Sequence, residues 1–153
     1  MIGAGEKAYY DNMTLLADFP RLADEGVRET SPATPNYNCI AWAAGDTSRW
    51  WEPDSWGDYY WPPGVPREMT VAAYAKAYET LGFEVCSDGS LEPDFEKVAL
   101  YATGQEPMHA ARQLPNGRWT SKLGPNVDIE HAVEGLAGGG YGDVVLFMKR
   151  SRS

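Results

Sequence analysis

One stretch of the chain, Arg67–Leu81, carries its apolar residues at helical spacing. Residues three and four positions apart lie on one face of an α-helix, so this stretch is predicted to be a helix that packs one face against a core. Gly82, which follows it, favours the end of a helix. The apolar positions are Val71, Tyr74, Ala75, Tyr78 and Leu81.

A shorter helix is predicted from Asn38 to Gly45, where the sequence reads Asn-Cys-Ile-Ala-Trp-Ala-Ala-Gly. The side chain of Asn36 or Asn38 can cap its first turn, and Gly45 can adopt the left-handed conformation that ends a helix. Cys39 therefore falls in the first turn of this helix.

Further along the chain, the pattern changes to short runs that are typical of β-strands. Two of these runs flank Asn116-Gly117, a pair that tolerates positive φ and predicts a hairpin turn. We expect strands at residues 83–86, 97–101, 108–114, 118–123 and 144–148.

Two further helices are expected, at Ala8–Leu16 before the break at Phe19-Pro20 and at Asp128–Leu136 with Asp128 as its cap. Helices thus precede a mostly antiparallel sheet into which one helix is inserted. This order predicts an α+β fold with N-terminal helices packed on the sheet. The length of 153 residues fits a single domain that spans 1–153.

The segment Trp50–Pro66 has no clean period and is predicted to be a structured loop. The chain has six Trp, and four of them lie between Trp50 and Trp61. The loop either packs its own aromatic rings over the core or offers them as a wall for a sugar, peptide or apolar ligand. Its carboxylates are most simply a solvated rim; they are Glu52, Asp54 and Asp58.

The formal net charge of −9 argues against a nucleic-acid surface, which needs a basic patch to displace counterions. No apolar run approaches the ~18 residues of a membrane span, and Met1–Tyr10 does not resemble a signal peptide. Cys39 and Cys86 could pair, but two free thiols and a cytoplasmic location are expected without a secretion signal. The spacing of His and Cys specifies no metal site, and no cofactor is implied.

The candidate chemistry rests on Cys39 at a helix start and on His109 in a later strand. A helix N-terminus favours the thiolate, and an imidazole can take the thiol proton and return it to a leaving group. Thr120, Ser121 or Asp128 could orient that imidazole. Backbone N–H groups near Cys39 could bind an oxyanion with help from Asn36 or Asn38; Trp42 and Trp61 are further candidates for substrate contact.

The order of a Cys at a helix start, a His on a strand and a polar residue on the next strand resembles the core of papain-like cysteine hydrolases. This group includes papain-type proteases, CHAP-type amidases and transglutaminase-like enzymes. Asn38–Ala43 resembles their nucleophile helix, Met108–Ala111 their His strand, and Gly117–Gly124 the strand that follows. The chain as a whole also resembles a family of uncharacterised bacterial proteins.

The resemblance implies a small cysteine peptidase, amidase or acyltransferase that acts on an amide or thioester bond, with Cys39 as nucleophile and His109 as base. Its substrate would be a peptide or a small molecule, with no nucleic-acid or membrane partner. The alternative is a non-catalytic binding domain that uses the Trp/Tyr-rich loop. In that case Cys39 is a buried core residue, as cysteines in Ala-rich helices usually are.

Overall fold

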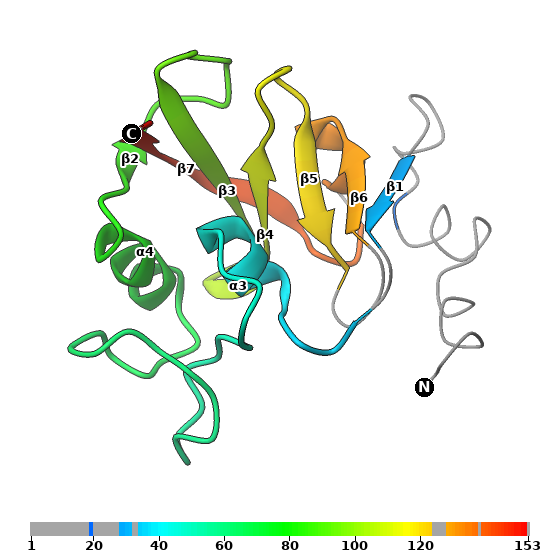
Figure 1. The fold of residues 1–153 in the computed structure, drawn as a ribbon. Coiled ribbons are helices and arrows are strands. Elements are labelled where there is room, and N and C mark those ends of the chain that lie inside the picture. Colours follow the sequence, from blue (N-terminus) through cyan, green and yellow to red (C-terminus); the bar gives the residue numbers. More distant parts are fainter. Residues whose placement is uncertain (1–18, 20–27, 32–33, 124–127, 138, 153) are drawn as a thin grey trace.

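The computed structural model describes residues 19, 28–31, 34–123, 128–137 and 139–152, which form a seven-stranded sheet with two short α-helices on one face (Figure 1). All neighbouring strands are antiparallel, in the order β1-β6-β5-β4-β3-β7-β2. The elements are β1 Arg28–Ser31, α3 Cys39–Ala44, α4 Val71–Glu79, β2 Glu84–Cys86, β3 Phe95–Thr103, β4 Glu106–Gln113, β5 Trp119–Lys122, β6 Asp128–His131, the 3-10 helix η3 Val133–Leu136 and β7 Asp143–Ser151.

The predicted α+β class was wrong, because the described part of the chain is mainly β. The two α-helices have six and nine residues, and both follow β1 rather than forming an N-terminal layer. The helix expected at Ala8–Leu16 lies outside the described residues.

The prediction of a helix at Asp128–Leu136 was also wrong. Asp128–His131 is β6, paired with β5 on one side and β1 on the other, and only η3 after it is helical. All four residues of β6 are buried. Pairing on both edges satisfies the backbone groups of this segment, so tertiary context decides the structure rather than the capping signal at Asp128.

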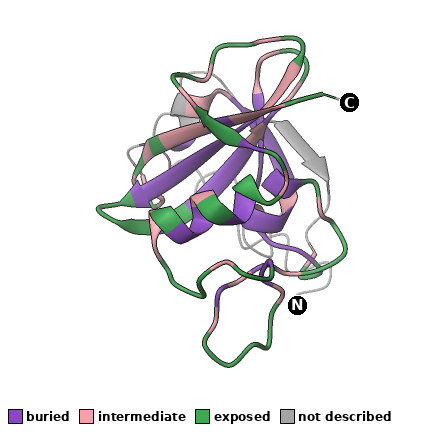
Figure 2. Cartoon of the chain, turned by 90° about the vertical axis from the view of Figure 1, so that its left-hand side faces the viewer, coloured by how far each residue is buried: buried purple, intermediate pink, exposed green. Residues whose placement is uncertain are grey.

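The first face of the sheet packs against α3 and α4 (Figures 1 and 2). Ala110 of β4 and Leu100 of β3 contribute to this core together with the buried face of each helix. The two helices are joined where the Tyr78 hydroxyl donates to the carbonyl oxygen of Ile40 at 2.9 Å. This core fixes the start of α3 against β4.

The second face of the sheet carries a separate core. Trp119 of β5 and Phe147 of β7 are in ring contact at 5.9 Å, although β4 and β3 lie between these strands. A flat sheet would hold β5 and β7 roughly 14 Å apart. Gly89 lies against both rings, where a Cβ would come within 2.7 Å of Phe147. The sheet therefore curls around a second core, which also contains Phe19.

Gly142, just before β7, has the closest neighbours of the described glycines, and Gly142→Ala should destabilise the fold by about 2 kcal/mol or more. Its φ is +78°, and a Cβ would lie 2.2 Å from the carbonyl oxygen of Ala102. Gly45→Ala is the matched control, because Gly45 also has positive φ but faces open space; it should cost about 1 kcal/mol. Urea unfolding of both variants measures the difference, and equal losses would contradict the close approach.

Candidate functional site

Asn38 fixes the position of Cys39 by holding two segments together. Its Oδ1 accepts from the N–H of Ala41, which caps α3, and from the N–H of Trp51. Its Nδ2 donates to the carbonyl oxygen of Trp51 at 2.7 Å. Oδ1 and one N–H of Nδ2 are thus engaged in joining α3 to the aromatic loop, and one N–H of the amide is left.

The thiol of Cys39 lies in an environment that keeps it protonated. The residue is half-buried at the first position of α3. Burial raises the pKa of the thiol to about 11, and hydrogen bonding at the backbone of Ala110 and the charge of Lys122 only partly oppose this. The short helix therefore does not produce the reactive thiolate that the sequence suggested.

His109 lies on the other face of the sheet from Cys39. Successive strand residues point to opposite faces, and Ala110 packs in the core with α3. The His109 ring instead stacks on Tyr141 with centroids 4.1 Å apart and meets Tyr101 edge-on. The structure thus does not bring Cys39 and His109 together.

The imidazole of His109 is completely buried and is flanked by aromatic rings. Neither ring nitrogen has a hydrogen-bond partner among the described residues. Burial lowers the pKa of His109 well below its usual value, and the nearby His131 lowers it further. The ring is therefore a neutral core group in this fold.

None of the three candidates for the orienting residue is hydrogen-bonded to the His109 ring. The strand register pairs Thr120 with Arg112, not with His109. Ser121 is on the second face, with its hydroxyl 2.7 Å from Nε2 of His131. Asp128 is on the first face and accepts a hydrogen bond from the Tyr37 hydroxyl.

Ser121 and His131 form a buried hydrogen-bonded pair. Nδ1 of His131 lies 2.6 Å from the carbonyl oxygen of Ala132, which can only accept, so Nδ1 carries the hydrogen and Nε2 accepts from Ser121. Burial lowers the pKa of His131 to about 4, although the bond to Ala132 acts against this. Both side chains are completely buried, which suits a structural role.

The remaining sequence candidates have separate positions. Asn36 is exposed, and its backbone N–H donates to the hydroxyl of Thr34. Trp61 is 4% exposed and packs on Tyr74, so it belongs to the core rather than to a cleft. Trp42 is half-buried and stacks on Tyr37 with centroids 5.6 Å apart.

Sequence reasoning missed a polar cluster between α3 and the sheet. Lys122 is completely buried, donates to the carbonyl oxygen of Thr34 at 2.7 Å, and lies over the ring of Tyr37. Burial lowers the pKa of Lys122 to about 8, while the charge of Asp128 opposes this. Every second residue of β5 and β6 in this cluster is polar: Thr120, Lys122, Asp128 and Glu130. This alternation could have indicated a shared polar face, but only if β6 is known to be a strand.

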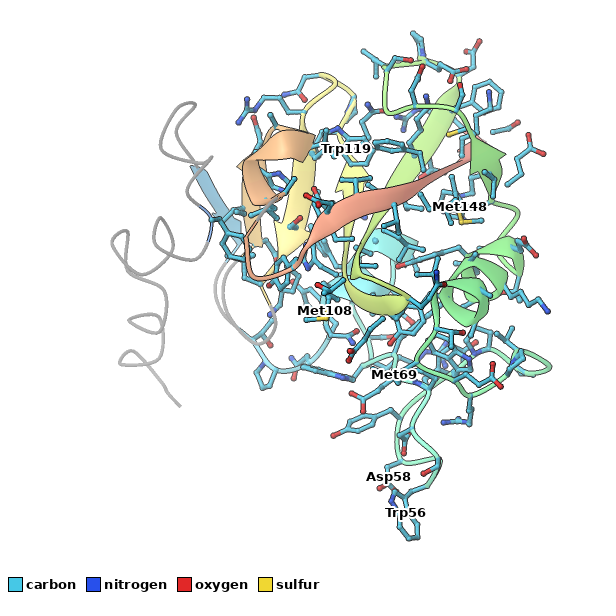
Figure 3. The ribbon with its side chains drawn as sticks, turned by 180° about the vertical axis from the view of Figure 1, so that it is seen from behind. Trp56, Asp58, Met69, Met108, Trp119 and Met148 are labelled. Carbon is cyan, nitrogen blue, oxygen red and sulfur yellow. The ribbon has the colours of Figure 1, made fainter. Side chains whose placement is uncertain are left out.

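The aromatic loop is held at its base by backbone hydrogen bonds. Glu52 N–H donates to the carbonyl oxygen of Tyr60 at 3.0 Å, and Tyr60 N–H donates to that of Trp50 at 3.2 Å. Trp51 is buried and packs on Tyr60, so part of the loop covers the core as expected. The loop then projects away from the domain to a tip at Trp56 (Figure 3).

Arg67 fixes the tip of the loop. Its Nη1 donates to the carbonyl oxygen and to Oδ1 of Asp54, and its Nη2 donates to the carbonyl oxygen of Tyr59. The carboxylate of Asp54 in turn accepts from the N–H groups of Asp58 and Tyr59. Trp56 nevertheless remains 87% exposed.

A hollow of about 440 Å³ lies between the end of α3 and the base of the loop. Its only carboxylate is that of Asp46, and burial would raise the pKa of this group. Hydrogen bonds from Ser48, Trp51 and Arg49 outweigh burial and hold the pKa below its usual value. Because these donors occupy the carboxylate, the hollow offers no open ligand for a cation.

No group of three or more His, Cys, Asp or Glu side chains is arranged to hold a metal ion among the residues that the structure describes. In the same residues, no helix is long and apolar enough to cross a membrane.

Residues 28–149 match the family described as "Domain of unknown function (DUF7689)". The match covers most of the chain, and the chain belongs to this family. No curated protein and no solved structure matches the chain. The family description assigns no activity, so neither the hydrolase nor the binding-domain hypothesis gains from it.

Iodoacetamide should label Cys39 more slowly than Cys86. Burial raises the pKa of Cys39 to about 11, so the thiolate needed for alkylation is scarce near neutral pH. Mass spectrometry of peptides after timed labelling measures both rates, with Cys39→Ser and Cys86→Ser identifying each site. A Cys39 rate that exceeds that of Cys86 and levels off below pH of about 8.5 would restore the nucleophile hypothesis.

Acidification should destabilise the fold through its two buried imidazoles. Their folded pKa values are depressed, so below the unfolded value of about 6.5 the unfolded chain binds protons that the folded chain does not. Stability is then lost as pH falls from about 6.5 to about 4, by up to about 1.4 kcal/mol per pH unit for each imidazole.

The variant His109→Phe isolates one of these contributions, because it keeps a ring between Tyr101 and Tyr141. Urea unfolding near pH 6 and near pH 5 should show a slope lower by about 1.4 kcal/mol per pH unit, with no loss of stability near pH 8. An unchanged slope would mean that His109 is already solvated or paired in the folded protein.

Proposed function

We propose that this chain is a non-catalytic binding domain that engages a basic protein partner through the loop Trp50–Pro66. One observation carries the proposal: Trp56 is 87% exposed at the tip of a loop whose shape is fixed by Arg67 and Asp54. The raised pKa of the half-buried Cys39 thiol and the position of His109 on the other face of the sheet favour this function over a cysteine hydrolase.

The fixed shape of the loop favours tight binding. Ordering a flexible loop upon association costs about 0.5–1.5 kcal/mol for each immobilised side chain. Here the hydrogen bonds of Asp54 and Arg67 have already ordered the tip. Trp is enriched among the residues that dominate interface energies because it combines a large apolar surface with few rotatable bonds.

The charge around the tip indicates the chemistry of the partner. Residues 50–66 contain three carboxylates and no Lys or Arg. Arg67 neutralises Asp54, but Asp58 is exposed beside Trp56 (Figure 3) and Glu52 is half-buried. A complementary surface would present an apolar pocket for Trp56 with Lys or Arg at its rim.

We also propose that the domain works in the cytoplasm. Cys39 and Cys86 are both free thiols in the structure. Reduced thiols persist where glutathione and thioredoxin maintain them.

A phage-displayed library of random dodecapeptides tests the proposed function. Peptides that bind the domain should combine an apolar residue with Lys or Arg, and Trp56→Ala should weaken their binding by roughly 30-fold, which corresponds to about 2 kcal/mol. Because Trp56 is exposed, the same change should leave the thermal midpoint of unfolding unaltered.

Val85→Ala is the matched control, because Val85 is also an exposed apolar residue, at 58%, but lies on β2. It should leave peptide binding unchanged. The proposal fails if the library yields no such peptides, or if the selected peptides bind the Trp56→Ala variant as tightly as the native domain.

A further inference from the structure

Arg112 of β4 differs from the other arginines whose side chains the structure describes, because its guanidinium has no hydrogen bond or ion pair with any described residue. The guanidinium carbon lies 4.0 Å from the centroid of the Trp42 ring. Five N–H donors thus surround a half-buried charge without an acceptor. The arginines with an acceptor are Arg49, Arg67, Arg118, Arg150 and Arg152.

Two more donors without a partner belong to the same location. Thr120 of β5 is directly opposite Arg112 in the strand register, is 2% exposed, and has no partner for its hydroxyl in the described part of the chain. The same is true of the buried Nε1 of Trp42, the residue on which Arg112 stacks. A buried polar group without a partner costs about 1–3 kcal/mol, so a group of such donors at one place calls for an explanation, and a bound acceptor would supply it.

We propose that Arg112, Thr120 and Trp42 form a carboxylate-binding site between α3 and the strands β4 and β5. The guanidinium presents a planar fork that matches the two oxygens of a carboxylate, and the Thr120 hydroxyl beside it can donate to one of them. Arg112 and Trp42 are half-buried, so each side chain presents part of its surface to solvent.

The surroundings favour a carboxylate over a phosphate. Burial lowers the pKa of Arg112, and the negative charges of Asp128 and Glu96 act against this. The chain as a whole carries a net charge of −9. A dianion would meet stronger repulsion here than a monoanion. The neighbouring ring pair of Trp42 and Tyr37, stacked at 21°, provides a flat apolar wall, so the carboxylate should belong to a flat or apolar molecule.

Titration with sodium benzoate, followed by the indole N–H signals in NMR spectra, tests this site. The Trp42 signal, identified by its loss in Trp42→Phe, should shift in a saturable way. Arg112→Gln should weaken binding at least about tenfold, as expected for a lost charge-assisted pair. Arg49→Gln is the matched control, because Arg49 also lies over an aromatic ring but is already paired with Asp46; it should bind benzoate normally.

Thr120→Val separates a ligand-binding role from a structural one. It removes a buried hydroxyl without changing the shape of the side chain, so the stability without ligand should stay equal or rise, while benzoate binding weakens severalfold. The proposal is overturned if benzoate gives no saturable shift, or if inorganic phosphate binds more tightly than benzoate. It is also overturned if Arg112→Gln or Thr120→Val binds benzoate as tightly as the native protein does.

Discussion

Burial of both faces of one sheet is the constraint on which the rest of this structure depends. Each central strand contributes alternate residues to two separate cores, so neighbours in sequence enter different environments. Ala110 packs beneath α3, whereas His109 lies among the rings of Tyr101 and Tyr141. A Cys on α3 can therefore interact with every second residue of β4, and His109 is not one of them.

A second dependence runs through Asn38. Its side chain joins the first turn of α3 to Trp51, so the helix that carries Cys39 and the loop that carries Trp56 share one anchor. The loop is tied to the core again where Trp61 packs on Tyr74 of α4. This arrangement explains how an extended loop keeps a defined shape at some distance from the sheet.

Local signals in the sequence identified the elements whose structure is decided locally. The cap at Asn38, the stop at Gly45 and the turn at Gly117 all have the predicted conformations, because each depends on a few adjacent residues. Local sequence signals gave the wrong element where the pairing of strands distant in sequence decides the structure. Asp128–His131 becomes a strand because β5 and β1 flank it, and a single sequence does not reveal which strands will be neighbours.

The candidate site shows the same limit more sharply. Residue types suggested a Cys–His pair, but the face on which a strand residue lies depends on the register. The grouping of Arg112 with Thr120 and Trp42 requires that register as well as the position of α3, so it could not be read from residue types. The exposure of Trp56 likewise depends on the hydrogen bonds from Arg67 to Asp54 and Tyr59, and no local sequence pattern predicts these bonds.

The base of the aromatic loop has a consequence for how this family can change. Glu52 and Tyr60 are hydrogen-bonded to each other, so the chain leaves and re-enters the domain at nearly the same point. Residues 55–59, between the two, are exposed. Substitution at these exposed positions would therefore change the surface around Trp56 while the hydrogen bonds between Glu52 and Tyr60 stay in place.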